Sequence, residues 1–433
     1  MIRKRFGKII LLFPLMIVIY KPNSLKADQA PYNNINSLYE TQSISTPSSV
    51  GPFGLVDAGS NSKIRFQFAC QLWLYYQSLD NGPDSDRSSG LYMKARRIRL
   101  SLSGNIINPD YTFKLHLSAA PKSLELMDLY FNYKTDNCLQ FRFGQYKVPF
   151  TRYRIQSFQR LVFVDWSITT KYFGAERQMG FSLHNGYEKP PAWGYVIGVF
   201  TGVNARASHA VGLAKVYGED TVNPSDLVDP GPTAEFHPEF FLHVSRNANN
   251  IQLQSNTDAK REDLRHSVGL SVAWDLDPTE FQNFRIRLAP EFLLKYQGVS
   301  IFGATYIGYS YVNDPSQTKL TMVGGLFQTS YRINRTYEVS IRYSIVDFQG
   351  VLIDYARARS QQLIDDSGND PDVIKQFQNA GKMNREEEIT LGVNKYIIEH
   401  FLKWQTDFGW LKHSLDTETR NDFLVRSQFQ LTF

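Results

Sequence analysis

Apolar and polar side chains alternate along much of the chain after residue 60. In the stretch "KIRFQFACQLWLYYQ" the even positions from Ile64 to Leu74 are apolar, while Arg65, Gln67 and Gln71 occupy odd ones. Successive side chains of a strand point to opposite faces of the sheet. The pattern therefore predicts a strand with one apolar face and one polar face.

The same pattern of period two recurs to the end of the chain. It is present in "RRIRLSLSG", "YTFKLHLSA", "FRIRLAPEFLLKYQ", "YEVSIRYSI" and the final "NDFLVRSQFQLTF", and turn signals such as "IINPD" and "KTDN" separate the segments. Repeated alternating segments of roughly ten residues are typical of a transmembrane β-barrel. A soluble β-sandwich also alternates, so the pattern alone leaves both folds open.

The first residues separate these two folds. Arg3, Lys4, Arg5 and Lys8 precede an apolar run that ends at Tyr20, which is the layout of a secretory signal peptide. We expect residues 1–27 to be that signal, 28–60 to be a flexible N-terminal segment, and 61–433 to be the barrel domain. Export, aromatic residues near strand ends and a last strand that reaches Phe433 all favour a bacterial outer-membrane barrel.

Length predicts the size of the barrel. At about 25 residues for each strand and its connection, the chain after the signal gives about 16 strands, with 14 or 18 left open, and barrels of this size enclose an aqueous channel. The expected fold is thus an all-β, transmembrane antiparallel β-barrel around a water-filled lumen.

Charge and cysteine content exclude other classes. Residues 1–27 contain six Lys and Arg and no Asp or Glu, so without them the formal net charge falls from +5 to about −1. The barrel domain then lacks the basic excess expected for nucleic-acid binding. Two cysteines, Cys70 and Cys138, are too few for a disulfide framework of this size.

Four aperiodic stretches are predicted to be extracellular loops: 147–177, 204–235, 247–262 and 354–388. The first is basic and aromatic, with six Lys and Arg against Asp165 and Glu176. Folding into the barrel would shelter its aromatic residues and form a constriction whose Arg and Lys select anions. Alternatively, these charges face lipopolysaccharide phosphates or solvent.

The sequence contains no recognisable catalytic or nucleotide-binding motif, and we predict neither an enzyme nor a cofactor. The acidic stretch around Asp366 lacks calcium-ligand spacing and is interpreted as a polar turn. His116 is on the polar face of its strand, which favours a lumen-lining residue over a metal ligand.

The segment "RFGQYKVPF", followed by a long loop and "GAERQMGFSL", resembles the phosphate-selective porin O and P family. The upstream "RRIRLSLSGNI" and the C-terminal "EEEITLGVNKYI" and "DFLVRSQFQLTF" extend the resemblance from about Lys63 to Phe433. The resemblance implies a homotrimeric outer-membrane channel of 16 strands, with an arginine ladder in the lumen and a lysine-lined constriction.

Basic residues in these blocks and in the basic loop are the candidate anion-binding and pore-lining residues. They are Arg97, Arg99, Arg142, Lys147, Arg152, Arg154 and Arg426. Asp128, also on a polar face, is a possible carboxylate partner of Arg97 and Arg99. The lysines of the family's constriction have no one-to-one counterparts in the later loops of this chain.

Together these features predict a porin for passive diffusion of small solutes, with a preference for anions such as phosphate. Its expected surroundings are outer-membrane lipid and lipopolysaccharide. A sugar or general nutrient porin is the alternative, because Trp73 and Tyr75 on the polar face could stack on sugar rings, although packing explains them equally well. A secreted soluble β-protein and a lipase-type membrane enzyme are more distant alternatives.

Overall fold

The computed structural model describes residues 55–57, 62–83, 86–119, 124–175, 177–186, 191–202, 238–276, 285–311, 319–366, 368, 371 and 382–433. The predicted signal peptide and the loop expected at 204–235 lie outside the described residues. Of the N-terminal segment 28–60, the structure describes only Leu55–Asp57, which forms a short strand, β1, paired with β2 (Lys63–Leu79). The sheet therefore begins within the segment that was predicted to be irregular.

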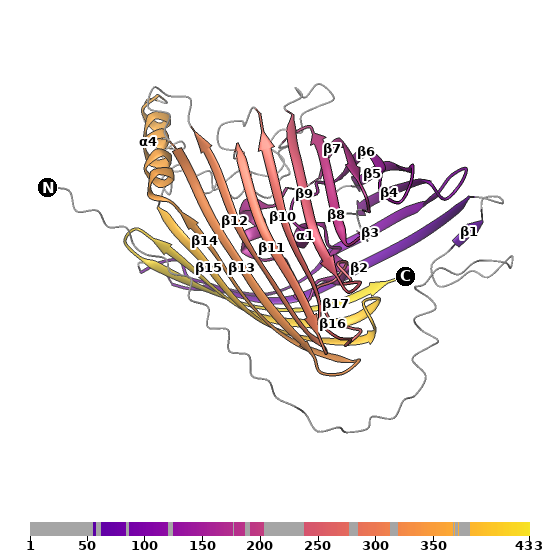
Figure 1. Ribbon diagram of the computed structural model, residues 1–433. Coiled ribbons are helices and arrows are strands. Elements are labelled where there is room, and N and C mark those ends of the chain that lie inside the picture. The colour runs from indigo at the N-terminus through magenta and orange to yellow at the C-terminus, as the bar shows by residue number, and fades with distance from the viewer. Residues whose placement is uncertain are drawn as a thin grey trace. The chain divides into compact units, whose positions relative to one another are not determined.

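Sixteen antiparallel strands, β2 to β17, close into a barrel, as predicted (Figure 1). Each strand pairs with its neighbours in sequence, and pairing of β17 with β2 and of β9 with β10 completes the ring. The strands after β2 are β3 (Ser88–Asn105), β4 (Tyr111–Ala119), β5 (Leu124–Lys134), β6 (Gln140–Lys147), β7 (Arg177–His184), β8 (Trp193–Phe200), β9 (Glu239–Ala248), β10 (Arg265–Asp275), β11 (Ile286–Tyr296), β12 (Val299–Tyr311), β13 (Lys319–Arg332), β14 (Tyr337–Phe348), β15 (Met383–Ile398), β16 (Leu402–Leu415) and β17 (Thr419–Thr432).

The barrel wall has a polar inner face and an apolar outer face, as the alternation in the sequence predicted. On β2, Gln71 is fully buried on the inner face, whereas its neighbour Leu72 is 49% exposed on the outer face. The outer face carries many exposed large apolar side chains, among them Phe131 and Phe408. A continuous apolar outer surface of this kind suits lipid rather than water and excludes a soluble β-sandwich.

Connections differ in length between the two ends of the barrel. The connection of β6 to β7 crosses one end, and because antiparallel strands alternate in direction, the connection of β9 to β10 lies at the other. The second end otherwise carries short turns, such as 297–298 between β11 and β12. The prediction that 247–262 is extracellular is therefore wrong, because strand order places this segment at the end where short turns gather.

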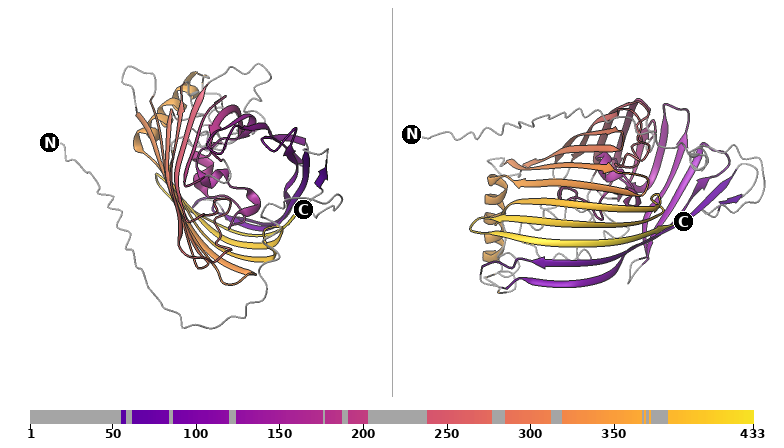
Figure 2. Two further views of the ribbon diagram at one scale, coloured as in Figure 1. Left: turned by 45° about the vertical axis from the view of Figure 1, so that its right-hand side comes forward. Right: turned by 90° about the horizontal axis from the view of Figure 1, so that it is seen from below.

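The loop between β6 and β7, residues 148–175 and called here the inner loop, lies inside the ring of strands (Figure 2, left). It contains α1 (Arg152–Ile155), a 3-10 helix (Phe158–Arg160) and α2 (Ile168–Phe173). A further helix, α4 (Gly350–Asp366), follows β14 at the rim (Figure 1). The stretch expected as a loop at 354–388 thus contains most of α4 and the start of β15.

Candidate functional site

The inner loop begins against the wall formed by β10 and β11. The amide of Thr151 donates to the hydroxyl of Ser271 at 3.0 Å, and the amide of Arg152 donates to the carboxylate of Glu291 at 2.8 Å. The side chain of Thr151 also accepts from the amide of Arg154 and so caps α1. Wall side chains thereby satisfy backbone donors that a buried helix end would otherwise leave unpaired.

The middle of the inner loop is held by β15 and β16. The carbonyl of Leu161 accepts from Nζ of Lys403 at 3.0 Å and from the amide group of Gln405 at 3.1 Å. The amide of Val164 donates to Asp407 at 3.1 Å. Buried polar groups on the barrel wall therefore replace water as hydrogen-bond partners of this segment.

The last part of the inner loop contacts the wall through α2. The amide of Ile168 donates to Glu388, and the hydroxyl of Tyr172 donates to Glu386 at 2.7 Å. Burial and the neighbouring Glu386 both raise the pKa of Tyr172 well above its ordinary value. Tyr172 is consequently protonated and remains a hydrogen-bond donor at neutral pH.

Asp165 connects the inner loop to β3. Its carboxylate accepts from Arg97 at 2.8 Å and from Arg96 at 3.3 Å. Both arginines reach it because Arg96 is the extra residue of a β-bulge, since Gln71 pairs with Arg97 and Leu72 with Ala95. Burial would raise the pKa of Asp165, but Arg97 and Arg96 outweigh it and hold this pKa well below its ordinary range.

Some basic side chains on the inner face of β3 and β4 are exposed to solvent, whereas arginines on other strands are buried. Arg287 and Arg342, on β11 and β14, are fully buried beneath the inner loop. In contrast, Lys94 is exposed, Arg99 is half-buried and the side chain of Lys114 is 32% exposed. The interior face of a closed barrel can be exposed only to interior solvent, so a water-accessible path runs along this side.

Arg99 differs from the other arginines of the lumen. Its Nη1 is buried without a hydrogen-bond partner, and among the described residues no carboxylate lies within ion-pair distance of its guanidinium. A guanidinium has five donors, and leaving a buried donor unmatched is costly. Arg99 therefore carries a positive charge that no carboxylate among the described residues pairs with.

Two further basic residues face an aromatic ring of the inner loop. Nζ of Lys147 donates to the carbonyls of Arg154 and Gln156 at 3.1 and 3.0 Å and lies 5.3 Å from the ring centre of Trp166. The guanidinium of Arg154 lies 4.8 Å from the same ring. These contacts fix the positions of both cations at the start of the loop.

Comparison with known proteins places this barrel among the channels of the outer membrane. The family model of the phosphate-selective porins O and P matches residues 66–221, which include most of β2, all of β3 to β8 and the inner loop. Over these residues the chain is similar to that porin family. A search of curated proteins returned no match.

Several solved structures share the fold of this porin. The outer-membrane channel DcaP of Acinetobacter baumannii is 12% identical, with 87% of this chain and 99% of that chain covered and a TM-score of 0.53. OprB of Pseudomonas putida is 11% identical, with 85% and 94% covered and a TM-score of 0.51. An anion-selective porin from Comamonas acidovorans is 12% identical, with 86% and 100% covered and a TM-score of 0.50. Identities this low show a common fold only.

The family match and the fold support an outer-membrane channel and point to a channel rather than an enzyme. Among the described residues, no helix is long and apolar enough to cross a membrane. Within the same residues, no three His, Cys, Asp or Glu side chains are grouped so that they could hold a metal ion.

The remaining candidate residues of the porin lie on the inner face or in the inner loop, in distinct surroundings. The guanidinium of Arg142 lies 4.4 Å from the ring centre of Tyr130 and donates to Asn132. Arg152 is buried where α1 meets Glu291. Arg426 forms a two-pronged ion pair with Asp407, at 2.8 and 3.0 Å. Anion contact by these three residues stays a prediction.

Asp128 does not pair with Arg97 or Arg99. It accepts from Arg177 at 2.6 Å and from His116 at 2.9 Å, so the pairing predicted from sequence is wrong. Strand order explains the difference, because β5 is separated from β3 by β4, and His116 on β4 is directly opposite Asp128. Asp165, the true partner of Arg97, was missed because its position depends on the path of the inner loop.

Trp73 and Tyr75 lie on the inner face, as predicted, but cations cover their rings. Nζ of Lys94 lies 5.3 Å from the ring centre of Trp73 and 4.4 Å from that of Tyr75, and Arg96 lies 5.2 Å from Trp73. Trp73 is 5% exposed, so its ring packs within the wall and offers little surface to a sugar.

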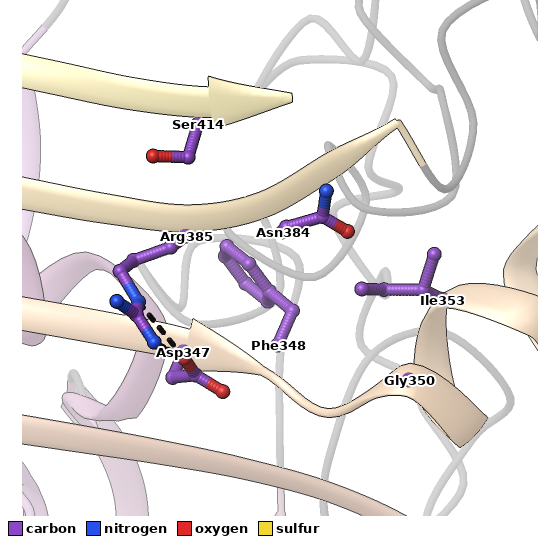
Figure 3. Close-up of a pocket in the computed structure, with 7 residues that line it drawn as sticks. All are labelled: Asp347, Phe348, Gly350, Ile353, Asn384, Arg385 and Ser414. Atoms are coloured by element: carbon purple, nitrogen blue, oxygen red, sulfur yellow. Dashed lines mark hydrogen bonds and ion pairs between the residues drawn. The ribbon is translucent and has the colours of Figure 1, made fainter. Parts of the chain in front are cut away.

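A small pocket of about 260 Å³ lies apart from these residues, at the rim beside α4 (Figure 3). Arg385 and Asp347 form an ion pair on one side of it, and Phe348 and Ile353 line the other. The pocket belongs to the packing of α4 against the ends of β14 and β15, and does not adjoin the path along β3.

Proposed function

We propose that this porin conducts small anions by passive diffusion and prefers oxyanions such as phosphate. The observation that carries the proposal is Arg99, a half-buried guanidinium on the inner face with no carboxylate partner among the described residues. Lys94 and Lys114 are exposed to the same path, while Arg96 and Arg97 share a single carboxylate, Asp165. Excess positive charge beside a water-filled path raises the local concentration of anions.

The chemistry of these groups suits oxyanions. A guanidinium is planar and presents paired donors that match the oxygens of phosphate, whereas an ammonium acts as a compact point charge. Conduction also requires that each contact remain weak enough to release the ion. Partial exposure of Arg99 and Lys114 to water meets this condition, because solvent screens their attraction.

Two comparisons support the proposal without deciding it. The matching family model is described as phosphate-selective, and one solved porin of the same fold is described as anion-selective. The covered rings of Trp73 and Tyr75 make a sugar-stacking track the weaker proposal. Assembly as a homotrimer in lipid and lipopolysaccharide remains an expectation from the family resemblance.

The test is competition between phosphate and chloride in single channels. Purified protein in a planar bilayer should show discrete chloride conductance, and added phosphate should reduce it in a saturable manner. A neutral sugar at the same concentration is the control and should have little effect. If chloride conductance falls with sugar but not with phosphate, the pore prefers sugars and the proposed oxyanion preference is wrong. If no conductance appears under any condition, the proposal that the protein forms a channel is wrong.

A further inference from the structure

We propose that residues 249–264, called here the inner turn, form a second internal segment of the channel that confines the pore to the side of β3 and β4 and thereby sets its selectivity. The proposal deepens the anion-channel function proposed above and rests on it. Three observations carry it: the burial of the inner turn, its contacts with the inner loop, and the charges that the two segments cover.

The inner turn folds into the barrel instead of projecting from its end. Leu253 is 4% exposed, Ile251 is 9% exposed and Asp258 is fully buried. Both apolar residues belong to the same buried cluster as the aromatic residues of the inner loop. Burying apolar side chains stabilises the inward position, because an outward turn would expose them to water.

Inner-face side chains of three different strands hold this turn. Nζ of Lys295 on β11 donates to the carbonyls of Gln252 and Ser255 at 2.7 and 2.6 Å. The hydroxyl of Thr257 donates to Glu338 on β14 at 2.5 Å. Asp258 pairs with Arg265 on β10. The inner turn therefore extends across the lumen from β9 as far as β14.

The two internal segments meet, although they enter from opposite ends of the barrel. The guanidinium of Arg160 in the inner loop donates to Gln254, and the hydroxyl of Ser255 donates to the carbonyl of Arg160 at 3.2 Å. His400, in the turn between β15 and β16, lies 3.4 Å from the same hydroxyl. The inner turn thus contacts the inner loop from the opposite end of the barrel.

The arginines of the wall covered by the two segments each have a carboxylate partner. Arg287 pairs with Glu239, Arg342 with Glu388, Arg426 with Asp407, and Arg265 with both Asp258 and Glu262. On the uncovered side, Arg96 and Arg97 share Asp165, and Arg99 has no carboxylate partner among the described residues.

This difference in charge pairing between the covered and uncovered sides of the lumen would determine the ion selectivity of the pore. Ions that pass along β3 and β4 encounter the side where Arg96 and Arg97 share one carboxylate and Arg99 has none among the described residues. Without the inner turn, ions would also pass over the wall where each arginine has a carboxylate partner, and Arg160 of the inner loop would lose its contacts with Gln254 and Ser255. A wider pore with a weaker anion preference is the expected consequence.

The test uses two neighbouring substitutions that introduce the same charge. Leu253→Asp places a carboxylate among buried apolar groups, which should drive the inner turn out of the lumen because an unpaired buried charge is very unfavourable. Gln252→Asp is the matched control, since the side chain of Gln252 is exposed. Both proteins are compared with the unmodified porin for unit conductance and for reversal potential in a potassium chloride gradient.

The expected result is a larger unit conductance for Leu253→Asp and a reversal potential closer to zero, with Gln252→Asp unchanged. A second variant, in which a two-residue turn such as 297–298 replaces residues 249–264, should behave like Leu253→Asp without any added charge. Folded variants with the original conductance and reversal potential would overturn the proposal. If the unmodified porin shows no anion preference, the proposed function is wrong. The change in unit conductance of Leu253→Asp would still test the role of the inner turn.

Discussion

Individual arginines of the lumen differ in what balances their charge. Strand periodicity alone predicted that Arg97, Arg99 and Arg426 would face inwards, and the structure places all three on the inner face. Periodicity did not predict their partners. Arg426 pairs with Asp407 on the neighbouring strand and Arg97 with Asp165 in the inner loop, whereas Arg99 has no carboxylate partner among the described residues. Pairing depends on register and on loop path, which alternation does not encode.

Replacing Arg99 should therefore weaken phosphate binding in the pore more than replacing a basic residue elsewhere. A hydrogen bond to a charged group contributes about 1.5 to 3 kcal/mol. Because Arg99 is half-exposed, we expect the lower end for Arg99→Gln, which corresponds to an inhibition constant for phosphate that is about tenfold higher.

The matched control for this change is Lys395→Gln. It removes the same charge from the outer face, where Lys395 is exposed. Phosphate inhibition of the chloride current is measured for both variants. Equal effects of the two substitutions would show that Arg99 acts only through the overall charge of the protein.

At the scale of elements, the strands could be predicted from the alternation of apolar and polar residues. Burial of the inner loop could be predicted from its many aromatic residues. The inner turn was assigned to the wrong end because loop length was used to decide sidedness. Counting strands would have corrected this, since an odd number of strands separates the inner loop from the inner turn. Burial of Leu253 and Asp258 beneath the loop had no signal in the sequence pattern.

The strand that leads into the inner loop requires glycine at position 144. Gly144 has a φ of +128°, and a Cβ added there would lie 2.2 Å from the carbonyl oxygen of Leu129. Gly144→Ala should therefore destabilise the pairing of β5 with β6 by about 1 to 3 kcal/mol.

Gly409→Ala is the control for this prediction, because an added Cβ on β16 would meet its nearest neighbour at 3.6 Å, an ordinary contact. Folding is followed by the heat-dependent change in electrophoretic mobility of barrel proteins, together with the denaturant midpoint. Comparable loss of folded protein in both variants would contradict the role assigned to Gly144.

At the scale of the whole molecule, the barrel wall could be predicted from the sequence, whereas the arrangement of the two segments in the lumen could not. Sixteen strands, a closed ring and an apolar outer face all follow from alternation repeated along the chain. The asymmetry of the lumen does not, because it depends on which inner-face side chains the two internal segments cover. Although Lys and Arg nearly balance Asp and Glu over residues 28–433, the accessible inner face of β3 and β4 carries Lys94, Arg99 and Lys114.

The most direct test of this account is the reversal potential of the purified porin in a planar bilayer with a gradient of potassium chloride. Potassium and chloride have similar mobilities in water, so the sign of the potential reports the charge preference of the pore itself. We expect the sign for chloride preference, and a smaller reversal potential at high salt on both sides, where the basic side chains are screened. A reversal potential with the sign for potassium preference would contradict it.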